Sequence, residues 1–442
     1  MRKSVEVREE RLARAWEALP PESELATVEG EPVRVVYPGR RNGGPGPDFL
    51  DAVIETGAGE VRGAVEVHQR TSDWERHGHG ADQSYRGVVL HVVGAHDGAT
   101  SRPPGGTQLP LLELAGGPSS GAAQRRYACS GSSAVEGALA RAGEARLEAN
   151  VARLSEALAA RPGDEEQLAY EEIAAALGYA RNSVPLRELA AAVPLERVRT
   201  FAGCLSGAPG SALRAEALLL GGAGLLPSQR HLPTRRRRDA YAGTLERVWK
   251  TAGTSAALRA YRWDHGQSRP ENSPVRRVVA LAHVALAWPG GGLLPAVRTA
   301  LLGKRGRSPA ALAGLVSVTC PDGYWLTHWD FGVAAKGASG GALAHDAGNE
   351  TPALVGAGRA ADVVVNVLLP LAAALGDAAL AGTARAAYEC HPALAENWIT
   401  RLVRERSALA APLNARAQQG LIHVYEQTCR ALKCGECVLG AR

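Results

Sequence analysis

The periodicity of apolar residues changes near residue 100, and this change constrains the fold more than any other feature of the sequence. Before it, short β-branched runs alternate apolar and polar residues, as half-buried strands do. After residue 140, Ala, Leu, Arg and Glu recur at helical spacing. A stretch rich in Gly, Pro and Ser separates the strand-like pattern from the helical one. The sequence therefore predicts an α+β fold: a small mixed-sheet domain over residues 1–98, a linker over 99–125 and a larger all-helical domain over 126–442.

The first domain is expected to contain one helix followed by four strands. A turn-forming Gly/Pro segment, residues 43–47, precedes the second strand. The apolar spacing and the alternation of side chains place the helix at residues 5–19 and the strands at 33–37, 48–55, 61–68 and 88–93. In the second domain, Asn272 or Ser273 before Pro274 is typical of a helix start, so we expect a helix from near Val275.

Composition and charge indicate an ordinary globular protein. The 442 residues are 45% apolar and 21% charged, and the net charge of +5 permits a nucleic-acid partner without requiring one. The run Arg235–Arg238 is more typical of a solvated face than of a phosphate site. Neither Met1–Arg14 nor the apolar stretch Ala361–Leu375 has the character of a signal peptide or a membrane span. We expect a cytoplasmic protein without membrane contact, of undetermined oligomeric state.

Acidic and imidazole side chains gather on the predicted strands. Asp48 starts one strand, while Glu66 and His68 lie two residues apart on the next and so face the same side of the sheet. Burying a carboxylate beside an imidazole is costly unless the two groups pair or bind a cation. Carboxylates suit Mg²⁺ or Mn²⁺, which can activate water and neutralise charge on a phosphate. The pattern predicts a divalent-cation site.

An Asp at the start of one strand and Glu-x-Lys on the next resembles the signature of restriction-endonuclease-like (PD-(D/E)xK) nucleases. In that fold a preceding helix usually carries another Glu, a place that Glu9 or Glu10 fits, and we assign it to Glu10. His68 occupies the Lys position, where it can act as a base or a metal ligand. Asp73, His77 and His79 are accessory candidates at the same edge. Taken singly, each of these residues is better explained as a turn cap or a surface group.

Three cysteines near the C-terminus form the most specific local motif. Cys429-x4-Cys434-x2-Cys437 places three thiolates within nine residues, as Zn²⁺ and [4Fe–4S] sites do. A fourth ligand is expected, and the spacing alone does not choose among the candidates. These are Cys129, Cys320, the Cys390-His391 pair and His423.

Nearly end to end, the chain resembles the bacterial domain-of-unknown-function family 2851. The resemblance implies that Cys129 is the fourth ligand, and it implies no substrate. It is carried by Gly46–Phe49, Val65–His68, Asp73-Trp74 with His77 and His79, Leu90–Val93, Tyr127–Cys129, Glu216–Leu218, Gly224–Leu226, Arg269–Pro274, Tyr324-Trp325, Asn366, Glu396-Asn397 and the three C-terminal cysteines.

Two functions are compatible with these features. The first is a metal-dependent nuclease in which Glu10, Asp48 and Glu66 hold Mg²⁺ or Mn²⁺ and His68 positions or deprotonates water. The second is a catalytically inactive module that binds nucleic acid or protein and retains a structural zinc or iron–sulfur site. We expect the first, and convergence of Asp48, Glu66 and His68 within metal-sharing distance is the structural observation that tests it.

Overall fold

The structure is a computed structural model, and the chain divides into two compact units. Unit 1 comprises Met1–Gly131, Arg406–Ala408 and Arg430–Arg442, and unit 2 comprises Ser132–Glu405 and Leu409–Cys429. The structure describes residues 2–19, 23–42, 46–57, 59–114, 135–203, 210–230, 232, 234–265, 272–288, 292–303, 308–319, 323–334, 353–407, 409, 411–431, 433 and 436–439.

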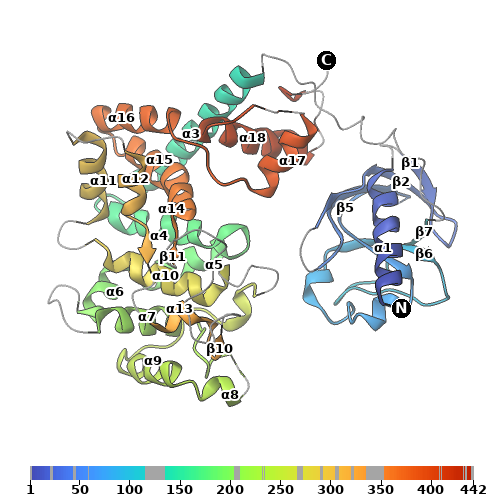
Figure 1. Ribbon diagram of the computed structural model, residues 1–442, viewed down its shortest axis with the longest axis horizontal. Helices are drawn as coiled ribbons and strands as arrows, with labels where there is room; N and C mark the ends of the chain where they lie inside the picture. Colours follow the sequence, from blue (N-terminus) through green and yellow to red (C-terminus); the bar gives the residue numbers. More distant parts are fainter. Residues whose placement is uncertain are drawn as a thin grey trace. The chain divides into compact units, whose positions relative to one another are not determined.

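Unit 1 is a mixed sheet with one long helix, α1 (Arg2–Glu17) (Figure 1). The strands run in the order β1-β2-β4-β5-β6-β7, with β3 paired to β4. Neighbours from β1 to β5 are antiparallel, and β5, β6 and β7 are parallel. The strands are β1 (Ser23–Ala26), β2 (Pro32–Tyr37), β3 (Arg40–Arg41), β4 (Phe49–Thr56), β5 (Gly59–Arg70), β6 (Val88–Ala95) and β7 (Leu111–Glu113).

The two faces of this sheet carry different side chains. Leu12 and Trp16 of α1 pack with Val65 and Val67 of β5 in one buried core. Because strand residues alternate between faces, Glu66 and His68 point to the opposite face. A second, smaller core on that side contains Trp74 and other buried residues.

Part of the predicted linker belongs to the sheet unit. β7 pairs with β6, and the Ser101 carbonyl accepts a hydrogen bond from the Leu109 amide. Residues 99–114 are therefore folded onto the sheet, and only the residues after Leu114 lie outside the described chain. The Gly/Pro content misleads here because a loop that packs back on its own sheet has the composition of a linker.

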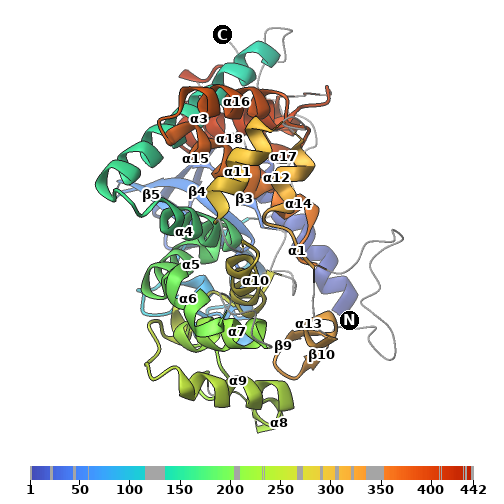
Figure 2. The same cartoon turned by 90° about the vertical axis from the view of Figure 1, so that its left-hand side faces the viewer.

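Unit 2 is helical, with two small two-stranded sheets, β8 (Val318–Thr319) with β11 (Ala353–Val355) and β9 (His328–Asp330) with β10 (Val333–Ala334). Together with unit 1 it confirms the α+β class. Within unit 2, α3, α15, α16 and α18 lie at one end and α6 to α9 at the other (Figures 1 and 2). Its helices are α3 (Val135–Ala160), α4 (Glu165–Leu177), α5 (Tyr179–Ala192), α6 (Leu195–Ala202), α7 (Ser211–Gly222), α8 (Thr234–Arg237), α9 (Ala240–Thr251), α10 (Pro274–Leu286), α11 (Leu293–Leu302), α12 (Pro309–Gly314), α13 (Gly323–Thr327), α14 (Ala357–Val363), α15 (Leu369–Ala374), α16 (Ala378–Glu389), α17 (Trp398–Arg406) and α18 (Ala415–Gln427).

One stretch of the described chain, Ala357–Ala374, has the length and composition of a membrane span. It runs from α14 through a π-helical turn, Val364–Leu368, into α15. Of this stretch, 56% is buried inside the protein. Its buried residues, among them Val363 and Leu371, belong to the core of unit 2, as those of a core helix do.

Candidate metal centre

A reciprocal pair of hydrogen bonds joins the first two predicted acids. The Asp48 amide donates to Glu66 Oε2 at 3.0 Å, and the Val67 amide donates to Asp48 Oδ2 at 3.0 Å. A bulge between Phe49 and Ala52 shifts the register of β4 on β5, and Asp51 within it has a φ of 61°. Bulges re-aim side chains near functional sites, and this one follows Asp48 directly. The two carboxylates are thereby fixed side by side.

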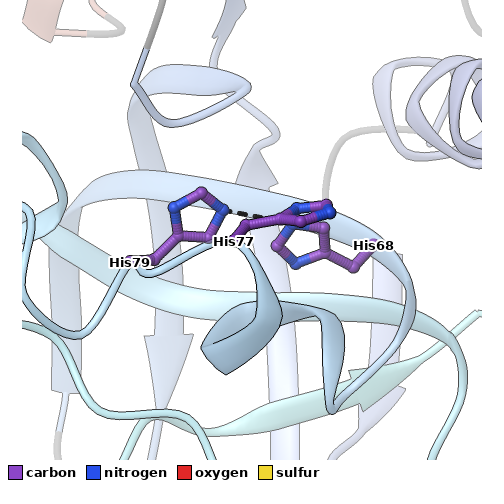
Figure 3. Close-up of side chains that lie close together, drawn as sticks. All are labelled: His68, His77 and His79. Atoms are coloured by element: carbon purple, nitrogen blue, oxygen red, sulfur yellow. Dashed lines mark hydrogen bonds between the residues drawn. The ribbon is translucent and has the colours of Figure 1, made fainter.

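His68 lies at the centre of a group of nitrogen and oxygen atoms. Its Nε2 is 3.1 Å from His77 Nδ1, 3.3 Å from His79 Nε2 and 3.4 Å from Glu66 Oε1. His79 Nε2 is also 3.3 Å from Glu66 Oε1. Figure 3 shows the three imidazoles directed toward one another. We call Glu66, His68, His77 and His79 the imidazole cage.

A one-turn helix, α2 (Asp73–Arg76), brings His77 and His79 to the cage. Asp73 fixes the start of this turn, since its Oδ2 accepts from the Arg70 amide at 3.1 Å and its Oδ1 pairs with Arg76 at 2.5 Å. Gly78, with a φ of 77°, reverses the chain between the two histidines, a conformation that glycine adopts without strain. Asp73 therefore positions the histidines through the backbone.

His91 and Ser101 extend the cage on its buried side. His68 Nδ1 is 2.9 Å from His91 Nε2, and His91 Nδ1 is 2.7 Å from Ser101 Oγ. His91 lies opposite Glu66 in the parallel β5–β6 register and is fully buried. The sequence prediction did not assign a role to either residue. A polar residue inside the apolar run of β6 was the available signal for His91, whereas Ser101 was hidden in the predicted linker.

Aromatic rings pack against the imidazole of His79. Tyr85 stacks on His79 with ring centroids 3.8 Å apart, and Trp74 lies edge-on to His79 at 5.4 Å. The Trp74 indole N–H donates to the Arg102 carbonyl at 3.1 Å, which fixes the ring. His77 is the exposed member of the three histidines, while His68 and His79 are buried. The inner side of the cage is therefore packed against aromatic rings, and the cage is exposed to solvent at His77.

Burial shifts every buried member of the group toward its neutral form. Burial, followed by the charge of Glu66, raises the pKa of Asp48 to about 7. Burial, together with the charge of Glu9, raises the pKa of Glu66 to about 8 although the Asp48 amide opposes the shift. Burial and the neighbouring imidazoles lower the pKa of His68 to about 2 and that of His91 to about 3. The protein alone thus favours the uncharged form of these groups, and a bound cation would stabilise the deprotonated carboxylates beside the neutral imidazoles.

Glu9, rather than Glu10, is the α1 acid that interacts with the site. Burial raises the pKa of Glu9, which is also influenced by His77, Asp73 and Asp48. Its Oε1 is buried and has no hydrogen-bond partner among the residues that the structure describes. Glu10 instead accepts hydrogen bonds from Arg41 and Arg14, which lower its pKa. The structure therefore does not bring Glu10 to the other predicted ligands.

The cysteine site is only partly within the described residues. Cys129, Cys320 and Cys434 lie outside them. Cys429 and Cys437 are half-buried, and Cys437 Sγ accepts a hydrogen bond from the Leu439 amide at 3.4 Å. Cys390 is exposed at the end of α16.

The fold and the cage define an α+β protein with a candidate metal centre built on the strands of a mixed sheet. More particularly, the chain belongs to the family described as "Protein of unknown function (DUF2851)", which its sequence matches over residues 9–386. No curated protein and no solved structure matches it.

Proposed function

We propose that unit 1 hydrolyses phosphodiester bonds of a nucleic acid with the help of a divalent cation. The observation that carries this proposal is the joining of Asp48 and Glu66 at the buried centre of the sheet, with Glu9 acting on both. In the described part of the chain, neither Asp48 nor Glu66 forms an ion pair with Lys or Arg. Two buried carboxylates without a protein cation favour binding of Mg²⁺ or Mn²⁺.

The order of elements adds support. A helix bearing Glu9 precedes an antiparallel series, β2, β4 and β5, and a strand parallel to β5 follows. Asp48 stands at the start of β4, and Glu66 lies on β5. This is the placement that a resemblance to restriction-endonuclease-like nucleases implies, so we assign that fold to unit 1 as part of the proposal.

The residues divide into ligands and a proton acceptor. Asp48 and Glu66 would hold the cation, which would supply charge to neutralise the phosphate and to activate water. Glu9 would accept a proton at Oε1, because this atom has no hydrogen-bond partner among the described residues and burial raises the pKa of its carboxyl group. Both nitrogens of His68 lie against other groups, so His68 orients Glu66 rather than acting as the base.

Nucleic acid is the favoured phosphodiester because of where the charge lies. Residues 1–131 contain more Asp and Glu than Lys and Arg, so the helical unit carries the net positive charge of the chain. A net positive charge favours association with a polyanion independently of its sequence. The Arg235–Arg238 run contributes less than its composition suggests, since Arg236 pairs with Asp330 and Arg237 donates to the Leu232 carbonyl.

The test compares Glu66→Gln with Glu60→Gln on the same strand. Glu60 is exposed and pairs with Arg62, so its variant removes one charge from β5 outside the site. With Mg²⁺ or Mn²⁺ and single- and double-stranded DNA and RNA, we expect Glu66→Gln to lose about a thousandfold or more in cleavage rate and Glu60→Gln to match the wild type. Binding without metal-dependent cleavage by the wild type makes the chain an inactive binding module instead. If the wild type neither binds nor cleaves nucleic acid, both functions are rejected.

We also propose that Cys429, Cys434 and Cys437 bind a [4Fe–4S] cluster or Zn²⁺ with Cys129 as the fourth ligand. The support is the spacing of the three C-terminal cysteines. Iron, sulfide and zinc analysis of anaerobically purified protein tests this proposal. Stoichiometric iron with sulfide identifies a cluster. If Cys434→Ser retains as much metal as the wild type, the proposed cysteine site is rejected.

A further inference from the structure

The imidazole cage differs in chemistry from the carboxylate pair beside it. Three of its four inward-facing atoms are imidazole nitrogens, and one is the Glu66 Oε1 that faces away from the Asp48 amide. Mg²⁺ takes oxygen ligands almost exclusively, whereas neutral imidazole with a carboxylate suits Zn²⁺. The cation of the proposed hydrolysis therefore does not explain the cage.

The spacing of the cage atoms is compatible with one ion. A tetrahedral Zn²⁺ with bonds of about 2.0–2.1 Å keeps its donor atoms about 3.3 Å apart. Four of the separations within the cage are 3.1, 3.3, 3.3 and 3.4 Å. One ligand nitrogen from each of the three histidines lies within 4.8 Å of the other two. We infer that the imidazole cage binds one Zn²⁺ ion, at a site separate from the catalytic cation.

The protons of the buried histidines agree with this inference. Ligation through Nε2 places the His68 proton on Nδ1, where His91 Nε2 accepts it at 2.9 Å. His91 then carries its own proton on Nδ1, 2.7 Å from the Ser101 hydroxyl oxygen. Metal-bound histidines ordinarily donate their second N–H in this way, and the partner fixes the ring and its tautomer. His91 and Ser101 are thus positioning residues of the zinc site.

Alternatives to an ion leave the cage poorly satisfied. A neutral imidazole has one N–H, yet His68 Nε2 faces a carboxylate oxygen and two further imidazole nitrogens. With its proton on Nδ1, this nitrogen has a single lone pair, which at most one of these neighbours can satisfy as a donor. A single dication accepts the lone pairs of the three imidazoles together.

The ion would have a structural role. With Glu66 as a fourth ligand beside the three histidines, a tetrahedral ion would keep no open position for water, unlike catalytic zinc. The ion joins β5, which supplies Glu66 and His68, to the turn after α2, which supplies His77 and His79. It also holds the Glu66 carboxylate, whose other oxygen faces Asp48. The inferred zinc therefore deepens the proposed function by fixing a ligand of the catalytic cation.

Zinc titration of metal-free full-length protein tests the inference with His77→Ala. His77 is exposed, so its removal spares the core of unit 1. The matched control is His96→Ala, because His96 is an exposed histidine of the same unit that bonds Thr71 outside the cage. We expect His77→Ala to weaken Zn²⁺ binding more than roughly a hundredfold and His91→Asn about tenfold to a hundredfold, with unchanged circular dichroism. His96→Ala is expected to bind as the wild type does.

X-ray absorption at the zinc edge separates the cage from the cysteines. The zinc lost in His77→Ala is expected to have only nitrogen and oxygen ligands at about 2.0–2.1 Å, whereas cysteine zinc shows sulfur at about 2.3 Å. Equal Zn²⁺ binding by the wild type and His77→Ala, or bound zinc with sulfur ligands alone, overturns the inference. Zinc binding in the cage without any nuclease activity rejects the proposed function and leaves this inference standing. Mg²⁺-dependent cleavage by a protein whose cage binds no zinc rejects this inference and leaves the proposed function standing.

Discussion

Several acids of unit 2 and the joined acids of unit 1 have pKa values shifted in opposite directions. In unit 2, Glu171, Glu172 and Asp330 are each bonded by arginine, and these bonds outweigh burial and lower the pKa of all three carboxyl groups. In unit 1, burial raises the pKa of Asp48 and Glu66, whose neighbours are histidines and another acid. The three acids of unit 2 are thus compensated by arginine within the protein. Asp48 and Glu66 are not, and carboxyl groups with strongly raised pKa values are commonly found at functional sites.

The largest expected effect is in unit 2. Glu216 is fully buried and accepts from the Tyr241 hydroxyl at 2.7 Å and the Trp325 indole at 3.0 Å, with His283 Nε2 at 2.7 Å. Glu216→Ala leaves these groups without their acceptor and is expected to cost about 3–5 kcal/mol of unfolding free energy. Urea denaturation followed by hydrogen exchange of unit 2 peptides measures it. The control, Glu196→Ala on the exposed face of α6, should stay within about 0.5 kcal/mol.

An intermediate effect of opposite sign is expected in unit 1. In metal-free protein, burial raises the pKa of Glu66 to about 8, so folding near pH 7 requires this carboxyl group to take up a proton, which Gln does not need. We expect the variant to stabilise unit 1 by about 1–2 kcal/mol while it abolishes cleavage. Hydrogen exchange of β5 peptides, without metal, gives the sign. A destabilised Glu66→Gln would mean that the acids of the two units play the same structural role.

The smallest effect is the pH dependence of unit 2. Because the folded pKa of Glu172 is lowered, its pairing stabilises the fold above the unfolded value near 4.5, and this contribution is lost as pH falls through the folded pKa. Arg153 and Arg187 are 47% and 42% exposed, so solvent screening limits the effect to about 1 kcal/mol. Glu172→Gln should lower stability at pH 7 and flatten the loss between pH 5 and 3. Denaturation curves across that range, compared with Glu196→Gln, measure the difference.

The sequence predicts the strands of the site because each has a local signal. The predicted strands at 33–37, 48–55, 61–68 and 88–93 correspond to β2, β4, β5 and β6 within two residues at each end, and Ser273 with Pro274 starts α10, its hydroxyl accepting from the Arg276 amide. Alternation also places Glu66 and His68 on one face. The choice between Glu9 and Glu10 has no such signal, since one residue rotates a side chain by about 100° around a helix and packing decides which faces the sheet.

The partners of the site residues are set by contacts that are distant in sequence. His91 meets His68 through the parallel register of β5 and β6, and Ser101 reaches His91 from a loop with linker composition. The sequence also did not predict the chain reversal at Gly78, which brings His77 and His79 into one cage. Sequence reasoning therefore named most of the polar residues of the site and missed the contacts of His91 and Ser101 that surround the imidazole cage.

Unit 1 is assembled from both ends of the chain, and this fixes the order in which it can be completed during synthesis. Residues 1–131 leave the ribosome first, whereas Arg430–Arg442, which belongs to the same unit, follows only after all of unit 2. The Arg430 carbonyl accepts a bond from Arg62 on β5, so the late segment closes on a strand that is already in place. Domains generally fold as they emerge. The C-terminal segment can therefore join unit 1 only after the ribosome has translated about three hundred further residues.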